Sequence, residues 1–407
     1  MKLVKTDSRR CISWGNCGEF GSRRPDHSNE IWINLDQLRA CCLASGVIGT
    51  PSKFSLPLVN TINLHGIDVG VGDPPNVHRL AIALGISNTL IGAEMPYVPT
   101  RSTVDLNRPF QIDHMYGNAS GKWVNDTISL GSGTDQIVLP NIMVGDVSSG
   151  SFIGFGKCDG MFTLNRVGDT AAHPENESDW TPMSYMWHRN LLEQNVFSLS
   201  FKPTRTLEPE QNGMITFGGI EPSLFIGKLY WYSCKSNTGW DWTVTISYGG
   251  KKMYPTPLMA ALDPAWALGP CLANDIFQDY IAGIPGSIWD YDDFQKNNPI
   301  GSVNRHVLKI PKTSVSKMKD LCFTAADKRP WCLTPEAQLL PEDMLPDPTY
   351  RYSYITPIGS TVEQGSTIVM GMKGLERFYS VYDRENYRVN NPNLITNDEF
   401  HTGETDI

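Results

Sequence analysis

The sequence lacks several features that would assign it to common classes. It has no apolar run long enough for a membrane-spanning helix, so we expect no membrane partner. It has no excess of basic residues, and its formal net charge of -9 argues against nucleic acid as a partner. Residues 1–20 contain basic side chains but no apolar core of a secretory signal peptide, so no targeting signal is visible. With 40% hydrophobic and only 19% charged residues, the chain has a globular composition.

The cysteines and histidines indicate no metal site. There are nine cysteines, an odd number, and Cys11, Cys17, Cys41 and Cys42 do not have the spacing of zinc ligands. The eight histidines are scattered, and their spacing supports no Ser-His-Asp or Cys-His arrangement. We therefore expect no metal and no cofactor.

Two further sets of residues leave alternatives open. Cys322 and Cys332 flank the hairpin-like stretch FTAADKRPW, and they form either a disulfide in an oxidising compartment or two buried thiols. Asn118, Asn125 and Asn176 each begin a glycosylation sequon, but such tripeptides are frequent by chance and favour secretion only slightly.

The pattern of the chain predicts a mainly β protein. Residues 1–57 lack periodicity, and we interpret them as an N-terminal extension or leader remnant. From residue 58 on, short β-rich runs are bounded by Gly, Pro, Asn and Asp. The expected strands are His78–Ile82, Ile128–Leu130, Phe197–Phe201, Met214–Phe217, Leu229–Tyr232, Trp242–Tyr248, Thr367–Met370 and Arg377–Asp383.

Helical spacing is confined to a few short segments. The candidates are Pro182–Gln194, Asn274–Ala282 and Ser314–Leu321. Many strands with few helices, over a chain of this length, predict two β-lobes. We place the first lobe at 58–200 and the second at 201–392, followed by a tail at 393–407. Trp240 and Trp242 are expected in the core of the second lobe.

An ordered set of segments resembles the pepsin-like aspartic proteases (peptidase family A1), in particular the fungal polyporopepsin type. No single piece carries the resemblance, but the order and spacing of the set do. The segments are Val69–Gly72 with Pro74–Pro75, Leu80–Ala93, Tyr116–Gly117, Cys158–Met161, Leu192–Phe201, Asn212–Gly219 and Gly374–Asp383. The resemblance implies the two-lobed acid protease fold with a cleft between the lobes, and an extended peptide as the partner.

The resemblance also implies a pair of catalytic aspartates, of which the first is missing. Such a pair shares a proton and activates a water, because two carboxylates at close range cannot both ionise. Gly85 and Ser87 match the family's first loop and set its register, which places Ala83 where the aspartate belongs. Leu84 and Ile86 replace two hydroxyl residues of that loop. Asp68 and Asp73 lie too early in the chain to substitute.

The second loop keeps its acid in an altered setting. Asp263 matches the second aspartate, but Pro264 and Ala265 replace the following threonine and glycine, which changes the backbone geometry. Without a like-charged neighbour, we expect no dyad-like rise in the pKa of Asp263.

The remaining family positions are partly retained. Tyr116 and Gly117 match the tip of the flap that covers a bound peptide, and with Gly85 and Ser87 they are the expected substrate-binding residues. Beneath the catalytic loops the family has an apolar-apolar-Gly stretch. Val369-Met370-Gly371 keeps it, whereas Met161-Phe162-Thr163 loses the glycine.

These observations favour a catalytically inactive homologue that retains peptide binding in its cleft. One alternative is an active aspartic endopeptidase that hydrolyses peptide bonds at acid pH, and another is a gene product without a selected function. The family resemblance implies a secreted protein, and we expect a monomer.

Overall fold

The computed structural model describes most of the chain from residue 52 onwards. All described residues lie in the compact unit that spans residues 51–407. Tyr116, Asn176, the cysteines before residue 52 and the expected tail lie outside the described residues. The described ranges are 52–62, 64–114, 117–133, 136–150, 158–166, 180–236, 239–266, 268–290, 307–344, 347–365 and 367–390.

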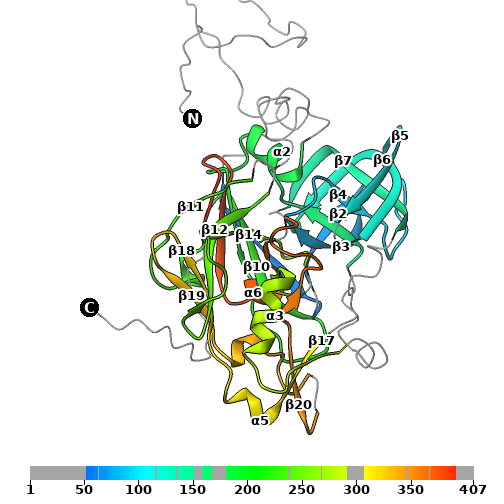
Figure 1. Ribbon diagram of the computed structural model, residues 1–407. Coiled ribbons are helices and arrows are strands. Elements are labelled where there is room, and N and C mark those ends of the chain that lie inside the picture. The colour runs from blue at the N-terminus through cyan, green and yellow to red at the C-terminus, as the bar shows by residue number, and fades with distance from the viewer. Residues whose placement is uncertain are drawn as a thin grey trace, which may run out of the picture. The chain divides into compact units, whose positions relative to one another are not determined.

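The largest sheet has thirteen strands and draws on both halves of the chain (Figure 1). Its order is β11-β24-β23-β9-β10-β1-β2-β3-β8-β4-β7-β6-β5, and β2 also pairs with β6. Strands from both expected lobes therefore share one sheet. They are β1 (Phe54–Asn60), β2 (His65–Val71), β3 (Asn76–Ala83), β4 (Thr89–Ile91), β5 (Val104–His114), β6 (Gly117–Leu130), β7 (Ile137–Gly150), β8 (Gly160–Thr163), β9 (Val196–Ser200), β10 (Glu210–Phe217), β11 (Tyr232–Ser233), β23 (Tyr379–Asp383) and β24 (Arg388–Asn390).

Two smaller sheets complete the second half. The eight-stranded sheet has the order β19-β18-β12-β14-β22-β15-β21, with β13 paired to β12, and a three-stranded sheet has the order β16-β17-β20. Their strands are β12 (Asp241–Tyr248), β13 (Lys251–Lys252), β14 (Leu258–Leu262), β15 (Cys271–Leu272), β16 (Ile288–Asp290), β17 (Val307–Pro311), β18 (Leu321–Ala325), β19 (Pro330–Leu333), β20 (Tyr350–Ser353), β21 (Thr356–Pro357) and β22 (Ile368–Met370).

The helices of the described residues are short. They are α2 (Pro182–His188), α3 (Asn274–Ala282), α5 (Lys312–Val315), α6 (Met372–Leu375) and the 3-10 turns Pro222–Leu224 and Glu336–Gln338. The prediction of α3 is confirmed at both ends. The expected helix Pro182–Gln194 is wrong beyond His188, because Asn190 adopts a left-handed φ of 60° that ends the helix. The expected helix Ser314–Leu321 is wrong after Val315, where α5 ends, and Leu321 begins β18 and pairs with β12.

The prediction of a mainly β protein is confirmed, and most expected strands are present with small changes in their limits. Two boundaries need correction. The first strand begins at Phe54 and pairs with β10, so the sheet includes residues that we assigned to the N-terminal extension. Of the expected strand Leu229–Tyr232, only Tyr232 is part of a strand.

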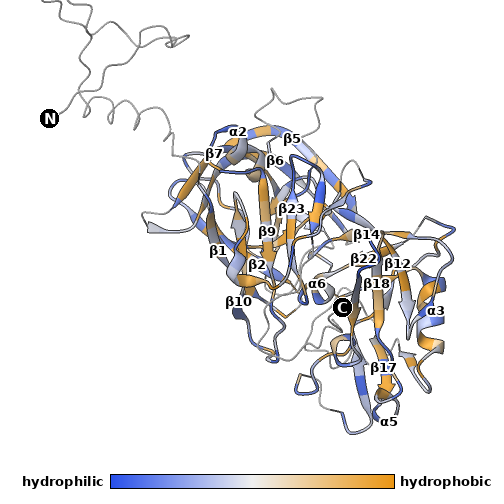
Figure 2. Ribbon diagram, turned by 90° about the vertical axis from the view of Figure 1, so that its left-hand side faces the viewer, coloured by the Kyte–Doolittle hydropathy of each residue, from blue (hydrophilic) through white to orange (hydrophobic). Residues whose placement is uncertain are grey.

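The strands form because apolar side chains recur at every second position. In β2, Ile67, Val69 and Val71 are buried, as expected for a strand whose alternate residues face one core. Figure 2 shows that the hydrophobic stretches lie mostly on the strands.

An aromatic cluster joins the large sheet to the second one. The ring centroids of Phe197 and Tyr382 lie 4.6 Å apart, and that of Trp240 lies 5.6 Å and 5.1 Å from them. The indole N–H of Trp240 donates to the carbonyl oxygen of Leu164, at 3.0 Å. Trp240 and Trp242 are both buried, as predicted from the sequence.

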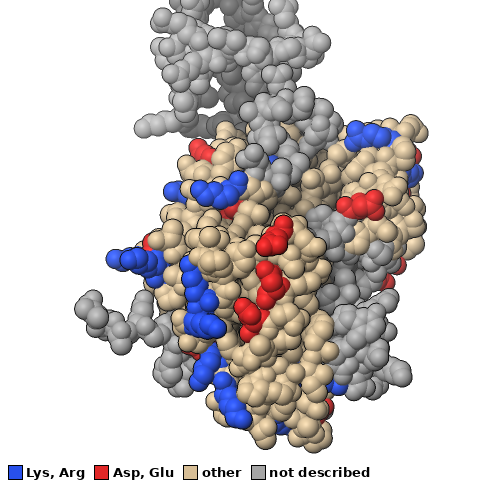
Figure 3. All heavy atoms as spheres, viewed as in Figure 1, with Lys and Arg blue, Asp and Glu red and all other residues tan. Residues whose placement is uncertain are grey.

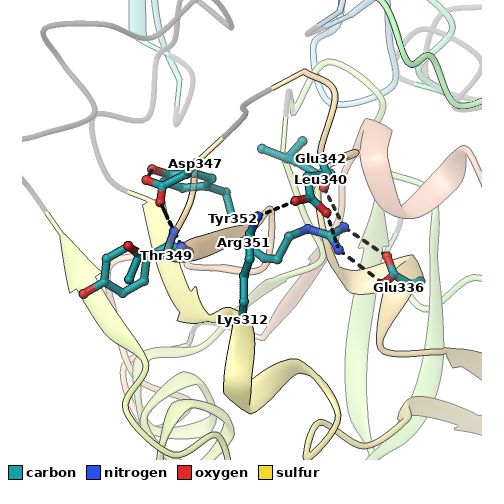
Figure 4. Close-up of polar contacts among 9 residues, drawn as sticks. Lys312, Glu336, Leu340, Glu342, Asp347, Thr349, Arg351 and Tyr352 are labelled. Atoms are coloured by element: carbon teal, nitrogen blue, oxygen red, sulfur yellow. Dashed lines mark hydrogen bonds and ion pairs between the residues drawn. The ribbon is translucent and has the colours of Figure 1, made fainter.

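Ion pairs connect several surface segments in the second half of the chain. Arg351 of β20 donates to the carboxylate of Glu336 and lies 3.7 Å from that of Glu342, which also pairs with Lys312 (Figure 4). The network holds β20 against the turn at 336–338 and against α5. On the face drawn in Figure 3, Lys and Arg side chains form one column and Asp and Glu side chains a second one beside it.

Candidate active site

The two loops that resemble catalytic loops follow strands in equivalent surroundings. Strand β3 runs parallel to β8, with Ala83 opposite Thr163, and the N–H of Leu164 donates to the carbonyl of Ala83 at 2.9 Å. Strand β14 runs parallel to β22, and the N–H of Asp263 donates to the carbonyl of Met370 at 3.1 Å. Ala83 and Asp263 thus occupy corresponding positions in two copies of one arrangement.

The side chain of Asp263 bridges the two loops. Its Oδ1 accepts a hydrogen bond of 3.1 Å from the backbone N–H of Leu84 and one of 3.0 Å from that of Ala265. The residue is only 4% exposed. The carboxylate is therefore bound to main-chain donors from both halves of the chain, in a site that is closed to bulk water.

This burial changes the acidity of Asp263. It raises the pKa of Asp263 to about 7, and hydrogen bonds from the backbone N–H groups of Leu84, Ala265 and Gly85 oppose the rise. The expectation that the pKa would not be raised is wrong. It considered only the loss of a like-charged partner, whereas desolvation alone is sufficient to favour the neutral form.

Ala83 lies in an apolar contact between the two loops. It has no exposed surface, and it belongs to a buried cluster that also contains Ile86 from the same loop and Ala265 from the opposite one. Trp266 is partly buried and packs against this cluster. Around Ala83 the first loop thus offers methyl and methylene groups rather than a carboxylate.

The segments beneath the two loops differ in whether they keep the glycine at their third position. At Gly371 a Cβ atom would lie 1.8 Å from the carbonyl oxygen of Leu268, so only glycine fits. In the first half the corresponding residue is Thr163, whose hydroxyl donates to the carbonyl of Ile86 at 2.6 Å. The threonine that replaces the glycine therefore fixes the altered loop in place, a contact that we did not anticipate from the sequence.

The two other acids near the first loop are held elsewhere. Asp68 accepts two hydrogen bonds from the guanidinium of Arg79, and Asp73 accepts two from that of Arg101. Both carboxylates lie at the surface in these ion pairs. Neither is available to occupy the position of Ala83.

The region expected to bind a peptide is partly described. Tyr116 lies outside the described residues, and Gly117 begins β6 of the β5–β6 hairpin with a φ of 128°. Gly85 and Ser87 are partly buried in the first loop. A small hollow of about 10 Å³, which is room for about one water molecule, lies beside this hairpin and is lined among others by Leu90, Ala119, Val147, Cys158 and Met161. Its lining is almost entirely apolar.

The candidate modification sites differ in accessibility. Asn118 is exposed, whereas Asn125 is only 7% exposed and its Nδ2 donates to Oδ1 of Asn141 at 3.0 Å. The fold leaves little space for a glycan on Asn125. Cys322 and Cys332 are joined by a disulfide between β18 and β19, which resolves the alternative left open by the sequence.

A buried polar cluster was not anticipated. Lys373 and Glu376, both less than 5% exposed, form an ion pair of 2.9 Å, and Glu376 also accepts from the side-chain amide of Asn60 at 3.2 Å. Nearby, burial and the charge of Lys373 lower the pKa of His65 to about 3. The three-residue spacing of Lys373 and Glu376 was the only sequence signal for this pair.

The sequence and the fold match those of known peptidases. The family described as "Eukaryotic aspartyl protease" matches residues 92–393, so this chain belongs to that family. The match begins after the first loop. In the part of the chain that the structure describes, no helix is long and apolar enough to cross a membrane.

Individual relatives place the chain more narrowly among the pepsin-like aspartic peptidases. Polyporopepsin from Irpex lacteus is 26% identical over 82% of this chain and 95% of its own length. Pepsin A from Canis lupus familiaris is 23% identical over 79% of this chain and 78% of its own length. The crystal structure of aspartic proteinase from Irpex lacteus superimposes with a TM-score of 0.72 at 25% identity, and covers 84% of this chain and 98% of that one.

Proposed function

We propose that this chain is a non-catalytic member of the pepsin-like aspartic peptidases. The observation that carries the proposal is Ala83, which has no ionisable atom and stands at the position equivalent to Asp263. Peptide hydrolysis by this family needs one carboxylate as general base and a second one that holds the proton. The loss of one member of a pair that acts as a unit costs roughly 10⁴-fold or more in rate.

The surroundings of Asp263 support the same conclusion. Oδ1 of Asp263 accepts hydrogen bonds from the N–H groups of Leu84 and Ala265, one in each loop. In the first loop, Ala83 provides a methyl group within the apolar cluster that also contains Ala265, in place of a second carboxyl group. We therefore assign Asp263 a structural role, in which its carboxyl group connects the two loops.

We further propose that the protein binds extended peptides with apolar side chains. The support is the peptidase family to which the chain belongs, together with the apolar surface beside the β5–β6 hairpin, which includes Leu90, Val147 and Met161. Peptides that lie along such surfaces are recognised by main-chain hydrogen bonds and by side-chain pockets.

A separate proposal concerns the compartment, the oligomeric state and the partners of this protein. We propose a secreted monomer that does not bind nucleic acid. The disulfide between Cys322 and Cys332 suits an oxidising compartment, and the net charge of -9 disfavours polyanions. Secretion with retention of the disulfide, and a single monomeric species in size-exclusion chromatography, are the expected results.

The test of inactivity is digestion of an acid-denatured protein substrate at acid pH, with the Asp263→Asn variant as the matched control. We expect both proteins to leave the substrate intact. Cleavage by the unchanged chain that is inhibited by a statine-type peptide and abolished by Asp263→Asn would show an active endopeptidase and overturn the proposal. Binding is measured separately by titration with a peptide of apolar side chains, and failure to bind would refute only that part.

A further inference from the structure

Strand β6 contains two sequons, and their asparagines differ in exposure to solvent. Asn118 lies at the beginning of the strand, opposite Asp113 of β5, and its side chain is exposed. Asn125 lies seven positions later, between Val104 of β5 and Met143 of β7, and it is buried. One strand therefore contains both an accessible acceptor and an inaccessible one.

The alternation of the strand sets the direction of Asn118. Its neighbour Ala119 is 1% exposed and lines the apolar hollow. Because successive side chains of a strand point to opposite faces, Asn118 points away from the hollow. Ser120, which completes the sequon, points to the same outer face, where its hydroxyl lies 2.8 Å from that of Ser149 at the surface.

We propose that Asn118 is an N-glycosylation site, and that its glycan covers the outer face of the β5–β6 hairpin, on the side away from the hollow. The donor is an oligosaccharide linked to a polyprenyl diphosphate. A bond forms between Nδ2 of Asn118 and C1 of the first sugar, the bond between C1 and the diphosphate oxygen breaks, and the amide loses one proton. The diphosphate leaves with the electron pair of the broken bond.

Asn125 provides the contrast within the same strand. Its Nδ2 donates to Asn141, and the surrounding strands leave no volume for a sugar. The structure thus reduces the two described sequons to one site.

The experiment is secretion of the full chain from a eukaryotic host behind a cleavable leader, which makes the result independent of natural targeting and of peptide binding. Peptide-N-glycosidase treatment followed by mass spectrometry identifies modified asparagines by their conversion to aspartate. We expect conversion at Asn118 and none at Asn125. The Asn118→Gln and Ser120→Ala variants should each lose one glycan in the intact mass, and Ser120→Thr should keep it.

Two results would overturn the proposal. One is recovery of the Asn118 peptide in unmodified form from the folded, secreted protein. The other is loss of the same glycan from the Asn125→Gln variant but not from Asn118→Gln. Site mapping of the unchanged chain decides the question even where a variant is poorly secreted.

Discussion

The backbone N–H of Leu84 donates a hydrogen bond of 3.1 Å to Oδ1 of Asp263, across 179 positions of sequence. The carboxyl group of Asp263 thus bonds directly to the loop in which the second acid is missing. In place of two carboxyl groups that share a proton, the two loops are joined by one buried acceptor and by the apolar cluster that contains Ala83. Stability and pH dependence therefore offer direct tests of this site.

The first prediction concerns Asp263→Asn. Burial raises the pKa of Asp263 from 3.8 to about 7, so the folded protein holds this proton more tightly than the unfolded chain. Its contribution to stability is complete below the ordinary pKa and is lost as the pH rises through about 7, by about 4 kcal/mol in all. Asn cannot titrate. Relative to the unchanged protein, the free energy of unfolding of the variant, measured in urea, should therefore increase by about 4 kcal/mol between acid and mildly alkaline pH.

Parallel stability profiles of the two proteins would contradict this assignment. Asp73→Asn is the control, because the pair of Asp73 with Arg101 lies at the surface, where such pairs contribute little to stability.

The second prediction concerns His65→Gln and has the opposite sign. Burial and the charge of Lys373 lower the pKa of His65 from 6.5 to about 3. The unfolded chain therefore binds the proton more readily, and stability is lost as the pH falls below the ordinary pKa, by about 5 kcal/mol in all. Glutamine retains a polar group for the contact with Asn212 but does not titrate. The variant should lose less stability on acidification, measured as the free energy of unfolding at acid and neutral pH.

If acidification destabilises both proteins equally, His65 is not the buried neutral group described above. His188→Gln is the control for replacement of a histidine in itself.

The third prediction concerns Ala83→Asp. Position 83 has no exposed surface, and the new carboxylate would face Asp263, so both acids cannot be ionised together. The variant should unfold at a lower temperature than the unchanged chain, and the difference should be larger at neutral pH than at acid pH. It should cleave no peptide, because Pro264 and Ala265 remain in the second loop.

Ala83→Asn is the control, because it introduces the same volume without charge and should show no such pH dependence. Proteolysis by Ala83→Asp would refute the view that both loops are damaged.

The fourth prediction compares Gly371→Ala with Thr163→Ala. A Cβ at 371 would lie 1.8 Å from the carbonyl oxygen of Leu268 and 2.6 Å from that of Trp266, and neither main-chain atom can move freely. We expect Gly371→Ala to destabilise by about 4 kcal/mol or more, within the range of severe substitutions. Thr163→Ala removes the hydrogen bond to Ile86 and should cost about 1–2 kcal/mol. Equal costs in chemical unfolding would mean that the two segments are not packed as described.

The fifth prediction concerns the disulfide between Cys322 and Cys332, which closes a loop with a sequence separation of ten. Removing a crosslink over a loop of this size should cost about 2–3 kcal/mol through the entropy of the unfolded chain. The double variant with serine at both positions should therefore unfold at lower urea concentration. Reduction of the unchanged protein should reproduce the shift, and Cys234→Ser, at a free thiol, should not. A double variant as stable as the parent would contradict the prediction.

The strands and their burial were largely predictable from local pattern. Alternating apolar residues predicted β12 and β23, and the placement of Trp240 and Trp242 in the core, because one face of each strand must be removed from water. The ends of elements were less predictable. Leu321 fits a helical pattern locally, but it pairs with Tyr248 of a strand more than seventy positions earlier, and no local signal contains that information.

The chemistry of the site was also only partly predictable from the sequence. That Ala83 cannot ionise, and that Pro264 has no N–H to donate, follows from residue identity alone. The raised pKa of Asp263 does not, because it depends on the removal of water by segments from both halves of the chain. Similarly, the role of Thr163 as a donor to Ile86 depends on the parallel pairing of β8 with β3.

By itself, the amino-acid sequence determined the β character of this protein, its family, and the absence of a carboxyl group at position 83. Only the tertiary structure decided what the surviving acid does, which of the described sequons is accessible, and that Cys322 is bonded to Cys332. The reason is physical, because covalent identity and periodicity are local, whereas burial, hydrogen-bond partners and distances between remote segments exist only once the chain has folded.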